Sequence, residues 1–444
     1  MKIVKMSLVA ALLIGSSAFA VENVQMSGDA QVMYNTTDAK GLTSNIIGGK
    51  KATDSGTLFD KDSSAADAGL NFNITADLAK NDLVTVSTGA GYTVLSTLGL
   101  ENNFVSNVWG GSHTATAPTA ANYGHAIGGA KVENANWLNE GWVAVTTGKS
   151  TAKLGRMELD TPLAFTEKWS IEKNTFEAAV LMNQDIQDTT LVAAYVGNGN
   201  GTETFGQNVN SNVATLGLAT GSVANRNGEF ATYGSNGAYA VGAVNNSFKP
   251  LTAQAWYYDV SQLTQAYWLQ ADVKCSLVEG VLIGAQYTGL TIDKGSVAGN
   301  TKDISSGAMA AMLGYEVKDM VTVKGAYSSV DTDFGAGFNT ATATGTAQSK
   351  LYTESWWSYG FVTQADTTAM AINAVSPVQG LFDLGLYYTK ANQTVKAGDR
   401  DLSEFALTAG KAFGPLETTL ALINSKVAAA DASNAVQAYL KLKF

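Results

Sequence analysis

The feature that most constrains this chain is a strict alternation of apolar and polar residues over long stretches. In residues 70–78 every second side chain is apolar and each intervening one is polar, and residues 84–94 continue in a similar way after a turn at 80–82. Alternation with a period of two indicates a strand with two chemically different faces. Strands of soluble sheets average about 5–6 residues, whereas a tilted membrane-spanning strand needs roughly 9–11. The pattern therefore predicts a transmembrane β-barrel.

The same unit recurs along the chain. Further strands are expected at residues 188–196, 251–260, 267–275, 281–290, 321–328, 381–389, 403–410 and 436–444, whereas 140–147, 152–158 and 238–245 alternate too weakly to give their faces. Short connections, such as those near 148–150 and 376–378, alternate with longer ones, such as 97–139 and 330–356. Bacterial barrels have short periplasmic turns and long extracellular loops, with an even number of strands. We therefore predict an all-β antiparallel barrel of about eighteen strands.

The first twenty residues resemble a targeting segment. Lys2 and Lys5 precede or interrupt an apolar run, and Ala18-Phe19-Ala20 has the small-x-small pattern of a cleavage site. We predict a secretory signal peptide at 1–20, which leaves 21–444 as the barrel domain. The alternative is a membrane anchor, for which the apolar run is too short.

The last strand has the most specific pattern. In residues 436–444 the apolar positions share one face, the other face carries Lys441 and Lys443, and the strand ends in Phe444. An apolar lipid face that ends in an interfacial aromatic residue is typical of a barrel strand. The ending also resembles the terminal aromatic signal for barrel insertion, so we expect Phe444 to be that signal and the barrel-assembly machinery to be a partner. The alternative is an ordinary edge strand.

If the apolar faces point outward, the polar residues between them line the interior. The predicted interior-facing residues are Asp77, Gln270, Asp272, Lys274, Lys324, Lys441 and Lys443, together with Asn71, Asn73, Gln254, Gln286 and Glu404. An interior with both signs of charge and with amides predicts a water-filled channel. Strand tyrosines are candidates for the aromatic belts at the membrane interfaces, namely Tyr92, Tyr257, Tyr267, Tyr327 and Tyr388.

Composition excludes several other classes of protein. One Cys excludes a disulfide scaffold, and one Cys with two His gives too few ligands for a His/Cys metal or haem site. A net charge of −10 and only three Arg argue against nucleic-acid binding. His113 and His125 share one loop without a defined catalytic partner, and the aspartates at 60, 62, 331 and 333 lack the ligand spacing of a calcium loop. We expect no enzyme, no cofactor and no metal.

One stretch resembles a known family. Gly155-Arg156, Pro162, Asn174-Thr175-Phe176-Glu177-Ala178 and the run from 185 to 191 resemble OprD-type outer-membrane porins and the major outer-membrane porins of Campylobacter-like (epsilon-proteobacterial) bacteria. The first twelve residues also look similar to the second group. The resemblance implies an eighteen-stranded, trimeric porin in the outer membrane of a Gram-negative bacterium. It also implies that the third outer loop folds into the barrel and narrows it.

The third outer loop of this sequence is 160–175. The predicted pore constriction comprises Asp160, Glu167, Lys168, Glu172 and Lys173, with Arg156 before the loop and Glu177 after it. Opposed charges at a narrow point orient polar solutes and set ion preference. The alternative is a solvated external loop. OprD-type channels for carboxylates carry a ladder of arginines, and the scarcity of Arg here favours a general or mildly cation-preferring pore instead.

The predicted function is an outer-membrane porin through which ions and small hydrophilic solutes diffuse passively, with membrane lipid as its surroundings. The alternative is a secreted or surface-exposed β-rich structural protein or adhesin. Face alternation and the terminal Phe444 favour the porin.

Overall fold

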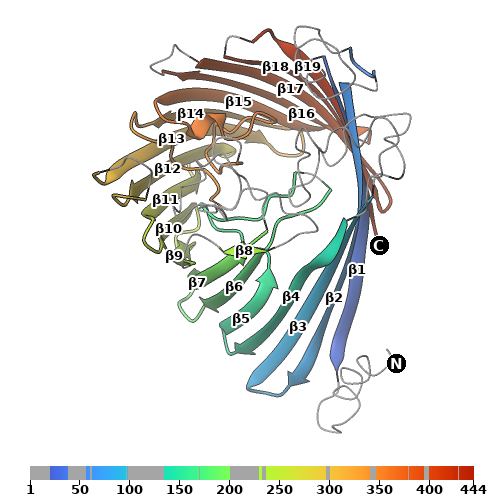
Figure 1. Cartoon of the computed structure of the whole chain (residues 1–444), viewed down its shortest axis with the longest axis vertical. Helices are drawn as coiled ribbons and strands as arrows, with labels where there is room; N and C mark the ends of the chain where they lie inside the picture. Colours follow the sequence, from blue (N-terminus) through green and yellow to red (C-terminus); the bar gives the residue numbers. More distant parts are fainter. Residues whose placement is uncertain are drawn as a thin grey trace.

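The chain forms one closed antiparallel β-barrel (Figure 1). The structure, a computed structural model, describes residues 21–38, 57–60, 63–96, 98, 135–169, 171–200, 230–232, 237–296, 301–340, 347–378, 380–394, 400–428 and 430–444. The predicted signal peptide, His113 and His125, and the position of Asp62 lie outside the described residues.

Eighteen long strands form the wall. Their bounds are β1 (Glu22–Thr37), β2 (Ser64–Lys80), β3 (Val84–Ser96), β4 (Ala135–Thr147), β5 (Ser150–Met157), β6 (Phe176–Asn183), β7 (Thr189–Gly199), β9 (Ala238–Asn245), β10 (Leu251–Val260), β11 (Thr264–Lys274), β12 (Val281–Ile292), β13 (Ile304–Val317), β14 (Val321–Val330), β15 (Thr367–Val378), β16 (Phe382–Gln393), β17 (Arg400–Phe413), β18 (Leu416–Val427) and β19 (Ser433–Lys443). A two-residue strand, β8 (Ala231–Thr232), pairs only with the end of β7. One short 3-10 helix, η4 (Phe361–Thr363), precedes β15.

Pairing of the first strand with the last closes the ring. β1 pairs with β2 on one side and with β19 on the other, and β7 pairs directly with β9. A closed ladder leaves no unpaired edge, which a sheet in lipid cannot tolerate. The prediction of an antiparallel barrel of about eighteen strands is therefore confirmed. Among the described residues, no helix has the length and apolar character that crossing a membrane would require.

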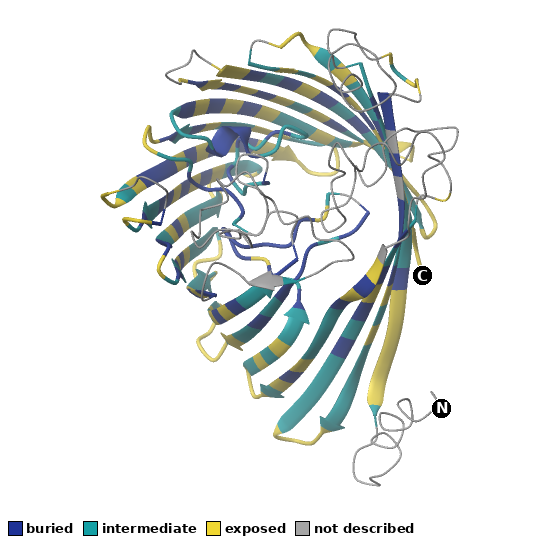
Figure 2. Ribbon diagram, in the orientation of Figure 1, coloured by how far each residue is buried: buried dark blue, intermediate teal, exposed yellow. Residues whose placement is uncertain are grey.

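Burial alternates along the wall strands (Figure 2). In β10 the side chains of Trp256, Tyr258 and Val260 are buried in the interior, while Ala255 and Tyr257, on either side of Trp256, are exposed. The exposed face is rich in large apolar residues on nearly every strand, for example Phe72, Leu154, Leu313 and Ile372. A water-soluble protein rarely exposes so continuous an apolar surface, whereas a lipid-facing wall requires one.

Exposed aromatic residues form two belts on the outer face. Most exposed tyrosines lie in the strand halves nearest the long connections, at Tyr92, Tyr195, Tyr239, Tyr257, Tyr267, Tyr287, Tyr327 and Tyr388, whereas Tyr315 lies beside a short turn. Most exposed phenylalanines lie at the opposite end, beside the short turns, at Phe248, Phe382, Phe413 and Phe444, whereas Phe72 and Phe405 lie farther along their strands. Amphipathic tyrosine rings suit one membrane interface, and the phenylalanines mark the other rim of the apolar wall.

Two connections differ from the sequence-based expectation. The short turn expected at 376–378 is displaced, because β15 continues to Val378 and Pro377 pairs with Asp383 beside the end of the strand. The connection expected at 330–356 is longer, because β15 begins only at Thr367. The sequence from 357 to 366 therefore belongs to a loop and not to the wall, and this loop turns inward instead of extending outside.

Candidate functional site: two inner segments and the cavity between them

Two long connections enter the barrel from the same end and fill much of its interior (Figure 1). The first inner segment, residues 158–175, joins β5 to β6, and the second inner segment, the described parts of 331–366, joins β14 to β15. Leu163 and Phe165 of the first segment and Leu351 and Phe361 of the second are almost fully buried. Their burial against inward-facing wall residues gives both segments a packed core.

The first inner segment is also held to the wall by hydrogen bonds. The amide of Asn71 on β2 donates to the Ile171 carbonyl at 3.5 Å, and the Leu163 N–H donates to the Tyr258 hydroxyl on β10 at 3.4 Å. Ile171 packs with Met33, Leu95 and Trp137 of three strands. The segment therefore spans the interior between opposite sections of the wall.

The two inner segments are bonded directly to each other. The side-chain amide of Asn339 donates to the Phe165 carbonyl at 2.9 Å and accepts from the Phe165 N–H at 3.1 Å. The Thr340 N–H and hydroxyl both donate to the Leu163 carbonyl, at 2.8 and 2.6 Å. Glu167 accepts from the Asn339 side chain and from the Gln348 N–H. Buried polar groups with complete partners of this kind fix one arrangement.

Glu404 on β17 anchors the second inner segment to the wall. Its side chain is buried, and its two carboxylate oxygens accept from the N–H groups of Trp357 and Ser358 at 2.8 and 2.9 Å and from the Ser358 hydroxyl at 2.6 Å. Loop backbone inside a barrel has no ladder partner, so a carboxylate with several acceptor sites satisfies amides that would otherwise be unpaired.

Glu354 organises the second inner segment from within. Its carboxylate accepts from the N–H groups of Ser349 at 2.7 Å, Ser355 at 3.0 Å and Gly360 at 3.2 Å. Burial raises the pKa of Glu354 to about 7, and these hydrogen bonds from Ser349, Ser355 and Gly360 oppose that rise.

This raised pKa has a consequence for stability. Because the folded protein binds the Glu354 proton more tightly than the unfolded chain does, the charged form costs stability above a pH of about 7, and this cost disappears as the pH falls toward the unfolded value. Glu354→Gln removes this titration, so we expect its unfolding temperature relative to that of the native protein to be higher at about pH 8.5 than at about pH 4. Differential scanning calorimetry in detergent at both pH values measures this difference. An unfolding-temperature difference that is the same at both values would contradict the assignment.

A network of ion pairs runs along the first inner segment. Glu158 pairs with both Lys168 and Lys173, Lys173 also pairs with Glu140 on β4 at 2.5 Å, and Asp160 pairs with Lys350 of the second segment at 2.5 Å. Burial favours the neutral form of Lys173, but Glu140 and Glu158 outweigh it and raise the pKa of Lys173. Burial acts to raise the pKa of Glu158, but the charges and hydrogen bonds of Lys173 and Lys168 outweigh burial and lower that pKa overall. Both groups are therefore charged at neutral pH.

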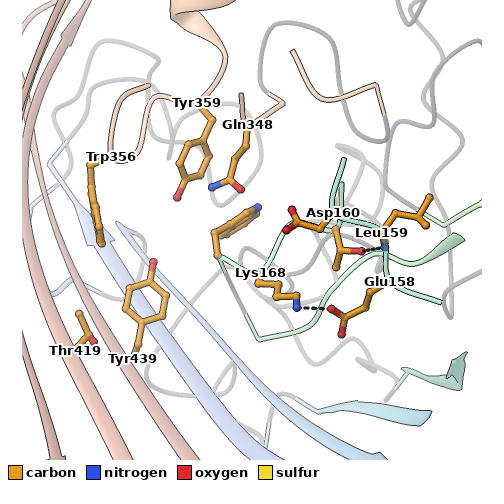
Figure 3. A pocket seen from close by; sticks show the side chains of 11 residues that line it. Glu158, Leu159, Asp160, Lys168, Gln348, Trp356, Tyr359, Thr419 and Tyr439 are labelled. Carbon is orange, nitrogen blue, oxygen red and sulfur yellow. Dashed lines mark hydrogen bonds and ion pairs between the residues drawn. The ribbon is translucent and has the colours of Figure 1, made fainter. Parts of the chain in front are cut away.

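Between the two inner segments and the wall lies an open cavity of about 690 Å³ (Figure 3). One side carries Glu158, Asp160 and Lys168 of the first inner segment, with Thr166 and Trp169. The other side is formed by the second segment and by β18 and β19, through Gln348, Trp356, Tyr359, Thr419 and Tyr439. A charged side thus faces a largely aromatic one across this cavity.

The predicted constriction residues fall into three groups. Asp160 and Lys168 line the cavity, and Lys173 lies within the ion-pair network beside it. Glu167 and Glu172 are buried within the first inner segment. Arg156 and Glu177 pair with each other at 2.8 Å. Their neighbours along the two strands, Met157 and Phe176, are buried in the interior. Because adjacent side chains of a strand point to opposite faces, the structure places the Arg156–Glu177 pair on the outer face.

The residues predicted to face the interior share faces with buried neighbours. Gln270 accepts from the buried Trp268 indole and donates to Asp272, which accepts from the Tyr352 hydroxyl of the second inner segment at 2.5 Å. Lys274 follows Asp272 on the same face. Lys441 and Lys443 share a face with the buried Gln437 and pair with Asp29 at 3.6 Å and Glu417 at 2.5 Å. Lys324 lies on the same face of β14 as the buried Ser328, and Asp77 lies on the same face of β2 as the buried Asn71.

Sequence reasoning missed several residues of the site. Glu158 lies two positions before the expected loop, and Glu140 and Lys350 come from distant parts of the chain. Glu354 and Glu404 were not recognised as anchors. The Trp356-Trp357 pair in a connection was the available signal, because two large apolar side chains in an exposed loop are unusual. Among the described residues, no three His, Cys, Asp or Glu side chains gather closely enough to hold a metal ion.

Comparison with known proteins identifies the architecture. No family model and no curated protein matches the sequence. Among solved structures, Pseudomonas aeruginosa OpdK with vanillate has a TM-score of 0.66 at 12% identity over 96% of this chain and 99% of its own. Pseudomonas aeruginosa OccK9 (OpdG) has 0.69 at 12% over 95% and 98%, and Acinetobacter baumannii OccAB4 has 0.68 at 9% over 96% and 99%. The fold is theirs. At these identities the likeness concerns architecture, and it extends over nearly the whole of each chain.

Proposed function

We propose that this protein is an outer-membrane porin of a Gram-negative bacterium, through which ions and small hydrophilic solutes diffuse passively. The observation that carries the proposal is the cavity itself, which lies inside a closed barrel with an apolar outer wall and is bounded by charged and hydrogen-bonding side chains. The predicted constriction, residues 160–175 of the first inner segment, narrows the pore, with Asp160 and Lys168 at its open face. The pore needs no catalysis and no cofactor for this role.

The outer surface supports a membrane location. The apolar wall between the tyrosine and phenylalanine belts is the surface that lipid would cover. An adhesin or secreted structural protein would expose this wall to water, so we favour the porin over that alternative. The fold likeness to the outer membrane protein OpdK of Pseudomonas aeruginosa supports the same location.

Phe444 is proposed as the insertion signal that the barrel-assembly machinery recognises. Its ring is exposed on the outer face and lies edge-to-face with Phe72 at 5.8 Å between ring centroids. Gly28 leaves room for this ring, because a Cβ at that position would lie 2.5 Å from it. A homotrimer, as the resemblance implies, is likewise proposed.

Ion preference at the constriction should be weak. The network contains three acids, Glu140, Glu158 and Asp160, each paired with at least one of the lysines Lys168, Lys173 and Lys350. Lys153 on β5 also interacts with Glu140 and Glu158, so the acids of the network have no excess over the lysines. The acidic balance of the whole chain is therefore the remaining source of a mild cation preference.

Planar-bilayer recording of the purified, heat-modifiable protein tests the proposal. We expect stable single-channel conductance and a small reversal potential of cation-preferring sign in a salt gradient. Folded protein that inserts into the bilayer without conducting would refute the channel, and a clear anion preference would refute the weak cation assignment.

A further inference from the structure

We propose that the cavity between the two inner segments is a binding site for neutral, polyhydroxylated ring solutes, that is, for sugars. This inference rests on the proposed function for the route by which solute enters, and it adds the class of solute that the passage retains. Its basis is the division of the cavity into an aromatic side and an internally neutralised charged side.

The aromatic side presents ring faces that are already fixed in place. Trp356 packs against Tyr387 of β16, with ring centroids 4.8 Å apart and a tilt of 30° between the ring planes. Trp357 and Tyr359 of the second inner segment contact Trp169, which reaches across from the first inner segment, at centroid distances of 5.8 and 6.0 Å. These contacts join the two inner segments and the wall into one aromatic cluster. Because the rings are held before any ligand arrives, stacking on them costs little conformational entropy.

Ring faces of this kind select for the C–H face of a sugar ring. An aromatic face is electrostatically negative at its centre, and the C–H groups on one face of a pyranose are slightly positive and apolar. Trp356, Tyr359 and Tyr439 all line the same space, and Figure 3 shows their side chains directed toward it from the side opposite Glu158 and Lys168.

The charged side offers hydrogen bonds without offering a free charge. Glu158 is neutralised by Lys168 and Lys173, and Asp160 by Lys350. A charged solute would therefore have to compete with an existing ion pair, whereas hydroxyl groups can use the carboxylate acceptors and ammonium donors that the pairs leave open. Asp160 and Lys168 remain mostly exposed, at 90% and 61% of their side chains, so both reach the cavity.

The neutral groups complete a site for hydroxyls. Thr166, Gln348 and Thr419 add donors and acceptors around the same space. A cavity of about 690 Å³ lies within the roughly 300–1,000 Å³ range of small-molecule sites, which is larger than one hexose needs and leaves room for passage.

Equilibrium binding to the folded protein in detergent tests the inference without requiring ion flow. Titration calorimetry and tryptophan fluorescence would use maltose as the probe, with sorbitol as a polyol lacking a ring face and benzoate and benzylamine as charged ring compounds. We expect maltose to bind with a dissociation constant of about 1–100 mM and each of the others to bind at least about fivefold more weakly.

Two variants locate the site. Trp356→Ala should weaken maltose binding about fivefold or more, because stacking is lost, while the matched Tyr257→Ala on the outer face should leave it unchanged. Conserved heat-modifiability shows that each variant is folded, and Trp356→Phe, which retains a ring, should restore part of the binding.

The inference is overturned if sorbitol binds as well as maltose, if a charged ring compound binds more tightly, or if Trp356→Ala leaves maltose binding unchanged. Bilayer recording separates the two proposals. A protein that conducts but does not bind maltose refutes the sugar site alone, and one that binds maltose but does not conduct refutes the porin alone.

Discussion

Deletion of residues 165–173 is expected to raise single-channel conductance at least about twofold, because the first inner segment occupies the interior between opposite sections of the wall. The segment contributes Thr166, Lys168 and Trp169 to the cavity, and the deletion removes all three. It also removes two acids, Glu167 and Glu172, together with two lysines, Lys168 and Lys173, so the net charge of the chain does not change. The increase in conductance is therefore expected to come from the wider passage, with little change in ion preference, and conductance and reversal potential recorded on the same channels will measure both.

The matched control for this deletion is Arg156→Ala combined with Glu177→Gln. This pair was expected at the constriction from the sequence, but the structure places it on the outer face, so its removal should leave conductance and selectivity unchanged. If the long deletion impairs folding, Trp169→Ala provides a milder test, and it should give a smaller increase in conductance. Unchanged conductance in a folded deletion variant would mean that the segment lies outside the conducting path.

Replacement of Glu404 by Ala is expected to release the second inner segment from the wall. The change leaves the N–H groups of Trp357 and Ser358 without their acceptor, at a cost of roughly 1–3 kcal/mol for each buried unsatisfied group. The segment contributes Trp356 and Tyr359 to the cavity, so its release should widen the pore and make the open-channel current noisier. Open-channel noise and mean conductance in planar bilayers provide the measurement.

Glu417→Ala is the suitable comparison for Glu404→Ala. Glu417 is also a glutamate on an adjacent wall strand, but it pairs with Lys443 near the short-turn end. Its loss should change neither the noise nor the mean conductance appreciably. Equal effects of the two variants would show that wall charge, and not anchoring of the second segment, controls the current.

The wall of this barrel was predictable because its chemistry is local. Alternation in residues 70–78 or 251–260 reports directly which face meets lipid, and the observed strands there are β2 and β10. A short turn fixes the next strand as an antiparallel neighbour, so strand order followed from the spacing. The total number of strands was predicted, but β1, β6, β13, β15 and β18 received no individual range, and the connection before β15 is longer than expected.

The interior was less predictable because its partners are distant in sequence. Phe165 meets Asn339 and Glu167 meets Gln348, and no local pattern connects such positions. Arg156 and Glu177 show the complementary error. Their charges beside a charged loop suggested the pore, but strand parity beside Met157 and Phe176 turned both outward. Loops have no period from which the direction of a side chain can be read.

The bonds between Phe165 and Asn339, and between Leu163 and Thr340, also have a mechanical meaning. A ring of eighteen strands held only by its circumference can flatten into an ellipse with little change in any one strand pair. The first inner segment is attached to β5 and β6, and the second to β14, β15 and β17. Because the two segments are bonded to each other, they connect distant parts of the wall and resist that flattening. The two inner segments, which pack against each other across the interior, are therefore expected to oppose flattening of the barrel under lateral pressure from the bilayer.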